Sequence, residues 1–182
     1  MSFDQNNSKP APDREQVLSK IPRTLIIGYG NPDREDDGVA WHVLVGIANY
    51  FGISTPNSYV EGLFPEGRTL DLWFNLQLTP EMADEMTPYA RICFIDAHTG
   101  AVEADIHWQI LESKFQNSPL THHLTPESLM SVLEHVYKRK PEAILVSIRG
   151  YQFGFHDILS QQTAELCSRA VGSIYNWIIQ PL

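Results

Sequence analysis

Residues 24–40 read TLIIGYGNPDREDDGVA, and this stretch decides the fold. The apolar run 25–27 is typical of a parallel strand that is buried on both faces. Gly28 and Gly30 allow a sharp turn after the strand. The acids at 35–37 then fall in the first turn of a predicted helix, where the helix dipole favours negative charge. The stretch therefore delivers carboxylates to the carboxyl end of a strand, where open α/β sheets place their ligand sites.

The same stretch has two other interpretations. It can be a first strand–helix unit with a well-capped helix and no ligand. It can also be a dinucleotide fingerprint, but Asp33 stands where the third glycine of G-x-G-x-x-G is needed. The three acids at 35–37 would also repel a pyrophosphate. The acids instead suit a bound cation.

The rest of the chain alternates between apolar runs and helical patterns, which predicts an α/β fold. Because the run 98–104 is too short for a parallel crossover, the strand after it should pair antiparallel. We therefore predict a three-layer sandwich, with helices on both faces of a mostly parallel sheet that has one antiparallel strand. The expected strands are 24–29, near 58–62, a short apolar segment near 70–78, 91–97, 104–111 and 143–149. The expected helices are 36–51, 80–87, 126–139 and 160–179.

Composition predicts one domain at residues 24–182, because 43% of the 182 residues are hydrophobic and no break divides the chain. Residues 1–23 are polar and contain three prolines, so we expect a flexible N-terminal leader. This segment lacks the apolar centre of a signal peptide. Only two cysteines occur, and Cys93 lies in an apolar run typical of a buried structural thiol. These features favour a cytoplasmic protein.

The formal net charge is −9, which disfavours nucleic acid and anionic membranes as partners. No apolar run approaches the roughly 20 residues that span a bilayer. The one basic cluster, at 138–140, follows a predicted helix, where cations complement the helix dipole.

Four segments together resemble the hydrogenase maturation proteases, and they span about residues 24–179. They are Gly28-Tyr-Gly-Asn31 followed by Asp36-Asp-Gly38, then Ile92-Cys-Phe-Ile-Asp-Ala97, Thr121-His-His-Leu-Thr-Pro-Glu-Ser-Leu129, and Gly150-Tyr-Gln-Phe-Gly-Phe155 with Leu159-Ser160. Members of this family are endopeptidases that remove a C-terminal extension from the large subunit of nickel–iron hydrogenases. The resemblance therefore implies a hydrogenase large-subunit precursor as the partner of this chain.

The resemblance implies that Asp37, Asp96 and His122 are both the catalytic residues and the metal ligands. The metal is nickel carried by the substrate, and zinc or cadmium can act as a surrogate. Parallel strands end at one edge of a sheet, so Asp37 and Asp96 can converge there. His122 lies in a loop before a helix and can reach the same rim. Two carboxylates and one imidazole suit a borderline divalent ion and leave coordination positions open.

Each of these residues also has an ordinary structural interpretation. Asp37 can be a helix N-terminal acid, and Asp96 can stabilise a turn. His122 competes with His123 for the ligand position, although only His122 has the family's spacing to the following helix. Beside them, we interpret Asp36 as a cap, Glu35 as solvated, and His98 as a partner of Asp96.

One segment departs from the best-known family pattern. Where those members carry an Asp-Gly-Gly-Thr-x-Gly loop, this chain has residues 74–81, FNLQLTPE, without a glycine pair. The chain also has no G-x-S-x-G nucleophile motif. Two alternative functions stay open at this point. The first is a nickel-binding accessory module for hydrogenase assembly that cleaves nothing, and the second is a metal-assisted hydrolase of small molecules.

Overall fold

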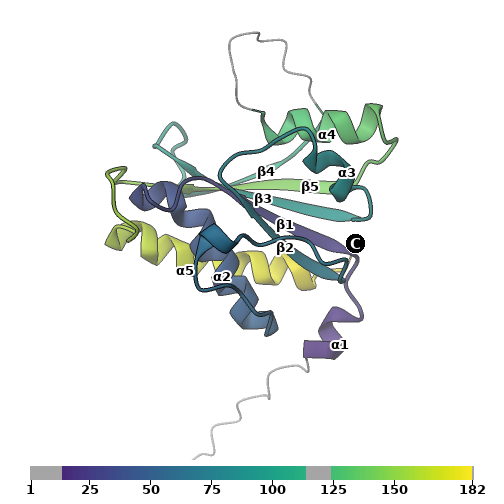
Figure 1. The fold of residues 1–182 in the computed structure, drawn as a ribbon, viewed down its shortest axis with the longest axis horizontal. Coiled ribbons are helices and arrows are strands. Elements are labelled where there is room, and N and C mark those ends of the chain that lie inside the picture. Colours follow the sequence, from purple (N-terminus) through teal and green to yellow (C-terminus); the bar gives the residue numbers. More distant parts are fainter. Residues whose placement is uncertain (1–13, 114–123, 182) are drawn as a thin grey trace, which may run out of the picture.

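The computed structural model describes residues 14–113 and 124–181, which form a five-stranded sheet in the order β2-β1-β3-β5-β4 (Figure 1). The strands are β1 (Thr24–Tyr29), β2 (Leu70–Asn75), β3 (Arg91–His98), β4 (Ile106–Ile110) and β5 (Glu142–Arg149). All neighbouring pairs are parallel except β4–β5, which is antiparallel. The predicted antiparallel strand is therefore confirmed.

Helices cover both faces of this sheet, which confirms the predicted three-layer α/β sandwich. As Figure 1 shows, α2 and α5 lie on one face, and α3 and α4 lie on the other. The helical elements are α1 (Arg14–Leu18), η1 (Glu35–Gly38), α2 (Val39–Phe51), η2 (Tyr59–Glu61), α3 (Met82–Met86), α4 (Pro126–His135) and α5 (Gln161–Ile179). Among the described residues, no helix has the length and apolarity needed to cross a membrane.

The central strands supply side chains to both layers of the core because successive residues of a strand point to opposite faces. Ile26 and Cys93 pack with α2 and α5, whereas Ile27 and Phe94 pack with α3 and α4. Cys93 is fully buried, as predicted, and this burial raises the pKa of its thiol. The sheet is thus a rigid platform whose carboxyl edge positions the loops that follow β1, β2 and β3.

The predicted strand near 58–62 is wrong, because this segment forms the 3₁₀ turn η2. The Ser58 hydroxyl accepts a hydrogen bond from the Val60 amide and starts the turn. Gly62 ends it with a φ of +75°, a conformation that favours glycine. Only Leu63 then reaches β2, through an isolated bridge to Phe74.

The predicted leader at residues 1–23 contains ordered structure near its end. Residues 14–18 form the helix α1, and Val17 and Leu18 pack against the core formed with α2 and α5. Ile21 belongs to the same core and is 8% exposed. The apolar residues 17, 18 and 21 share one helix-like face, which explains why this part docks. Residues 1–13 lie outside the described part of the chain.

Candidate functional site

Asp37 and Asp96 line a single cleft of about 290 Å³ at the carboxyl edge of the sheet. Asp37 belongs to η1, which follows β1, and Asp96 lies near the end of β3. Their predicted convergence is therefore confirmed. The cleft is lined by Tyr29, Gly30, Asp37, Leu76, Gln77, Leu78, Asp96 and Leu124.

Two features of the loop after β1 position Asp37. The Asn31 amide donates a hydrogen bond of 3.1 Å to Asp37 Oδ2. Gly30 has a φ of +136°, and a Cβ atom at this position would lie only 2.2 Å from the Asp37 carbonyl oxygen. The chain can turn from β1 into η1 at this distance only because residue 30 has no side chain.

We predict that Gly30→Ala destabilises the protein by at least about 2 kcal/mol and impairs the site, because the new methyl group must displace the Asp37 backbone. Urea denaturation measures the loss. The matched control is Gly172→Ala in α5, where a Cβ atom would meet no atom within 4 Å. That change should stabilise the helix by about 0.5–1 kcal/mol. Equal stability of Gly30→Ala and the wild type would contradict the close approach at residue 30.

Burial dominates the electrostatics of Asp96 and raises the pKa of its carboxyl group to about 7. Hydrogen bonds from the Tyr29 hydroxyl and the Ala97 amide oppose this shift, and the negative charge of Asp37 adds to it. Asp96 is therefore partly protonated at neutral pH when no cation is bound. A cation entering the cleft would favour the ionised form and release this proton.

Tyr29 is a site residue that the sequence patterns did not reveal. Gly28 pairs with Ile95 in the parallel register, so the next residues, Tyr29 and Asp96, lie side by side. The tyrosine hydroxyl donates to the Asp96 carboxylate, and burial together with the Asp96 charge raises the pKa of Tyr29. A tyrosine between two glycines has no signature of its own, and only the strand register identifies this role.

The third predicted ligand, His122, lies outside the described residues, as does His123. Within residues 14–113 and 124–181, no three His, Cys, Asp or Glu side chains are grouped so that they can hold a metal ion. The two cleft carboxylates supply oxygen ligands that suit a divalent cation, and a third ligand must come from elsewhere. The predicted pairing of His98 with Asp96 is not formed, because His98 Nδ1 accepts a hydrogen bond from the Gly100 amide instead.

Asp36 holds the segment before α5 against η1. Its side chain is 0% exposed and accepts four hydrogen bonds of 2.7–2.8 Å. The donors are the amides of Tyr151, Gln152 and Ser160 and the hydroxyl of Ser160. Burial alone would raise the pKa of Asp36, but these hydrogen bonds outweigh it and lower the pKa. The prediction that Asp36 caps the helix after it is therefore wrong, because Asp36 instead holds Ser160, which is the N-cap of α5.

Glu35 also holds the segment before α5, so the prediction that Glu35 is solvated is wrong. Its carboxylate accepts a hydrogen bond of 2.5 Å from the Gly154 amide, and its own amide donates to the His156 carbonyl. Glu35 has a φ of +50°, which is uncommon for a residue with a side chain. The two acids that precede Asp37 therefore tie the site to the chain around residues 150–160.

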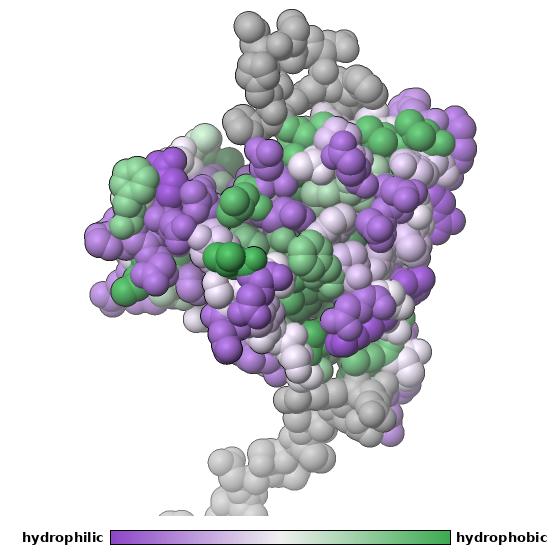
Figure 2. All heavy atoms as spheres, in the orientation of Figure 1, coloured by the Kyte–Doolittle hydropathy of each residue, from purple (hydrophilic) through white to green (hydrophobic). Residues whose placement is uncertain are grey.

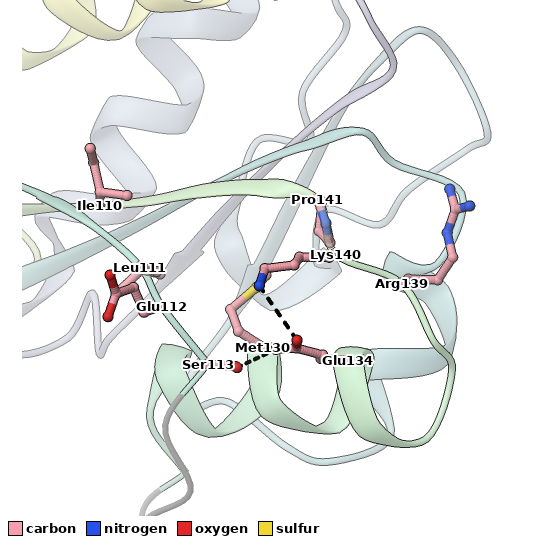
Figure 3. Close-up of a pocket in the computed structure, with 9 residues that line it drawn as sticks. All are labelled: Ile110, Leu111, Glu112, Ser113, Met130, Glu134, Arg139, Lys140 and Pro141. Atoms are coloured by element: carbon pink, nitrogen blue, oxygen red, sulfur yellow. Dashed lines mark hydrogen bonds and ion pairs between the residues drawn. The ribbon is translucent and has the colours of Figure 1, made fainter.

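A larger cavity, of about 450 Å³, lies between α4 and the end of β4 (Figure 3). It contains neither predicted carboxylate. Its acid Glu134 accepts a hydrogen bond from Ser113 and forms a 3.5 Å ion pair with Lys140, and these partners lower the pKa of Glu134 (Figure 3). Two acids, Glu112 and Glu134, line the cavity, but Arg139 and Lys140 also line it and Glu134 is already paired with Lys140, so the cavity is a poorer cation site than the cleft.

Several solved structures share the fold of this chain. The [NiFe] hydrogenase maturation protease HycI from Thermococcus kodakarensis KOD1 is 19% identical, with a TM-score of 0.61 over 91% of this chain and 98% of that one. The hydrogenase maturating endopeptidase HybD from E. coli is 15% identical, with a TM-score of 0.62 over 85% of this chain and 91% of that one.

A third structure, the [NiFe] hydrogenase maturation protease HybD from Thermococcus kodakarensis, is 16% identical, with a TM-score of 0.59 over 86% of this chain and 99% of that one. No protein-family model matches the sequence, and no curated protein matches it. The similarity to the solved structures extends over nearly the whole length of each and shows a shared fold.

Proposed function

We propose that this chain is an endopeptidase that removes the C-terminal extension of a nickel-loaded hydrogenase large-subunit precursor. The observation that carries the proposal is the pair Asp37 and Asp96 in one cleft. This pair lies at the carboxyl edge of a fold shared with HycI and HybD, which are maturation proteases. The four sequence segments that resemble the same family support the proposal independently.

In this proposal, Asp37 and Asp96 bind the nickel ion that the precursor already carries. The ion docks the precursor, and it places the scissile peptide bond in the cleft. Asp96 gives up its proton when the ion arrives, because a carboxylate ligand must be ionised. His122 supplies the third ligand, and cadmium or zinc can replace nickel in a binding assay.

The surroundings of the cleft fit hydrolysis that depends on the docked ion. No serine or cysteine lines the cleft within the described part of the chain, so no side chain there is a conventional nucleophile. Water is then the attacking group. The net charge of −9 disfavours nucleic acid and anionic membranes as partners. The two cysteines, Cys93 and Cys167, are both free, which supports a cytoplasmic location.

The test is to incubate the chain with a hydrogenase large-subunit precursor, with and without nickel, and to follow the released peptide by mass spectrometry. We expect release from the nickel-loaded precursor only. Tight binding of the loaded precursor without cleavage would favour the non-proteolytic accessory module. Tight binding of zinc by the chain alone, with no effect on any precursor, would favour the small-molecule hydrolase.

The proposed third ligand is tested by two neighbouring histidine variants. We predict that His122→Ala lowers the processing rate by at least about tenfold, because loss of groups that support a metal site typically has effects of this size or larger. His123→Ala is the matched control and should process at nearly the wild-type rate. Calorimetry with cadmium measures the same difference in ion binding. A loss confined to His123→Ala would reverse the assignment.

A further inference from the structure

An apolar groove adjoins the cleft that contains Asp37 and Asp96. The groove has a volume of about 390 Å³ and shares Leu76 with that cleft. Its lining contains no charged side chain and consists of Tyr59, Val60, Gly62, Phe64, Phe74, Asn75 and Leu76.

Three large apolar side chains of the groove are exposed to solvent. Val60 is 76% exposed, Phe64 is 60% exposed and Leu76 is 58% exposed. Figure 2 shows that hydrophobic surface interrupts the hydrophilic surface in the middle of this face, where η2 lies in Figure 1. Contiguous apolar surface rimmed by polar groups commonly marks a binding site.

The floor of the groove is held in place by aromatic contacts. Trp41 meets Phe74 and Tyr59 edge-on, with ring centroids 5.2 Å and 6.4 Å away. The Tyr59 hydroxyl donates a hydrogen bond to Asp33. Phe64 lies against Gly62, where a Cβ atom would come within 2.5 Å of its ring. A preformed pocket loses little conformational entropy when a ligand enters.

Charge restricts what can occupy the groove. Asp37 and Asp96 line the cleft on one side. On the other side, a cavity that shares Tyr59 and Val60 with the groove contains Asp33 and Asp157. An apolar group with uncharged or cationic neighbours is therefore complementary, whereas an anionic lipid surface or a nucleic acid is repelled.

Asn75 adds a polar group to the lining. Its Nδ2 atom has no hydrogen-bond partner within the described residues. The side-chain amide thus has spare hydrogen-bonding capacity beside an apolar surface.

We propose that the apolar groove binds an apolar side chain of the precursor segment that lies across the cleft, and that Val60 and Phe64 determine which precursor is accepted. The inference rests on the proposed endopeptidase function. Because Leu76 faces both spaces, a peptide seated between the two acids extends directly into the groove. The groove then contributes to binding of the precursor and leaves the chemistry at the acids unchanged.

The experiment compares Val60→Asp and Phe64→Ser with the wild type on the nickel-loaded precursor. Both side chains are exposed, so both variants should keep the wild-type melting temperature. We expect KM to rise by about tenfold or more, with kcat changed much less, because a lost apolar contact acts on binding. The matched control is Val136→Asp, which alters a valine that is 66% exposed near the end of α4. That variant should keep the wild-type KM.

A double-mutant cycle then identifies direct contact. Each apolar residue near the cleavage point of the precursor is changed to serine and combined with Val60→Asp. One precursor position should show a non-additive effect, because contacting residues couple and distant ones do not.

Unchanged KM in both groove variants, with an active wild type, would overturn the groove inference alone. So would sedimentation of the wild type as a dimer that Val60→Asp dissociates, since a second copy would then occupy the groove. A wild type that leaves every nickel-loaded precursor uncut would overturn the proposed function and the groove inference together.

Discussion

Asp96→Asn should lower the rate of precursor processing by at least about 100-fold while leaving the protein at least as stable as the wild type. Asparagine keeps the shape of the side chain but cannot carry the negative charge that a cation needs. Asp37→Asn should cause a similar loss of activity, because its carboxylate lines the same cleft. Rates are measured on the nickel-loaded precursor, and stability is measured by urea denaturation.

The expected gain in stability follows from the raised pKa of Asp96. Its carboxyl group ionises near pH 3.8 in the unfolded chain but only near 7 in the folded one. The wild type therefore loses stability as the pH rises between these two values, and it stays at the lower level above them. Asp96→Asn has no such loss, so its advantage should be present at pH 8 and absent at pH 3.

Asp84→Asn is the matched control for this pair, because Asp84 is an exposed acid of α3. It should process the precursor at the wild-type rate. If Asp96→Asn processes the precursor at the wild-type rate, Asp96 is not part of the site, whatever the stability of this variant. An Asp96→Asn variant that is less stable than the wild type at pH 8 would instead contradict the electrostatic argument.

Asp36→Ala should have the largest effect on folding, with a loss of about 3 kcal/mol or more in the free energy of unfolding. The substitution removes an acceptor of four hydrogen bonds and leaves the part-buried amides of Tyr151 and Gln152 and the buried amide of Ser160 without this partner. Ser160→Ala removes only the hydroxyl donor, together with the side-chain cap of α5. It should cost only about 1 kcal/mol.

The lowered pKa of Asp36 leads us to predict that its contribution to stability depends on pH. The pKa of Asp36 is lower in the folded chain than in the unfolded one, so its contribution is fully present at neutral pH. The contribution is lost as the pH falls through the folded pKa, in the range below about 4. The difference in stability between the wild type and Asp36→Ala should therefore shrink on acidification. A constant difference from pH 7 to pH 2 would contradict this account.

Much of the site could be predicted from local sequence, because its two acids follow apolar runs. Residues 25–27 and 92–95 have the composition of buried parallel strands, and such strands end at one edge of a sheet. The convergence of Asp37 and Asp96 follows from this rule alone. Tyr29 could not be identified in this way, because its contact with Asp96 depends on the register between β1 and β3.

The errors have two physical causes, which are local turn chemistry at residues 58–62 and a distant contact at Glu35. Tyr59 and Val60 have high strand propensity, but the Ser58 hydroxyl and Gly62 close a turn there. Glu35 has the appearance of a solvated acid until the chain returns at Gly154 to donate to it. No pattern within a few residues of Glu35 contains information about that partner.

The hydrogen bonds that Asp36 accepts have a consequence for when the cleft can form during protein synthesis. The residues that donate these hydrogen bonds lie 115 to 124 positions after Asp36 in the chain. A ribosome must therefore release the chain beyond residue 160 before the turn that carries Asp37 is secured. An emerging polypeptide contains both cleft acids well before that point, but it lacks the hydrogen bonds that tie their loop to residues 151–160. The geometry of the cleft is thus completed near the end of translation, so a partly synthesised chain should lack the finished site.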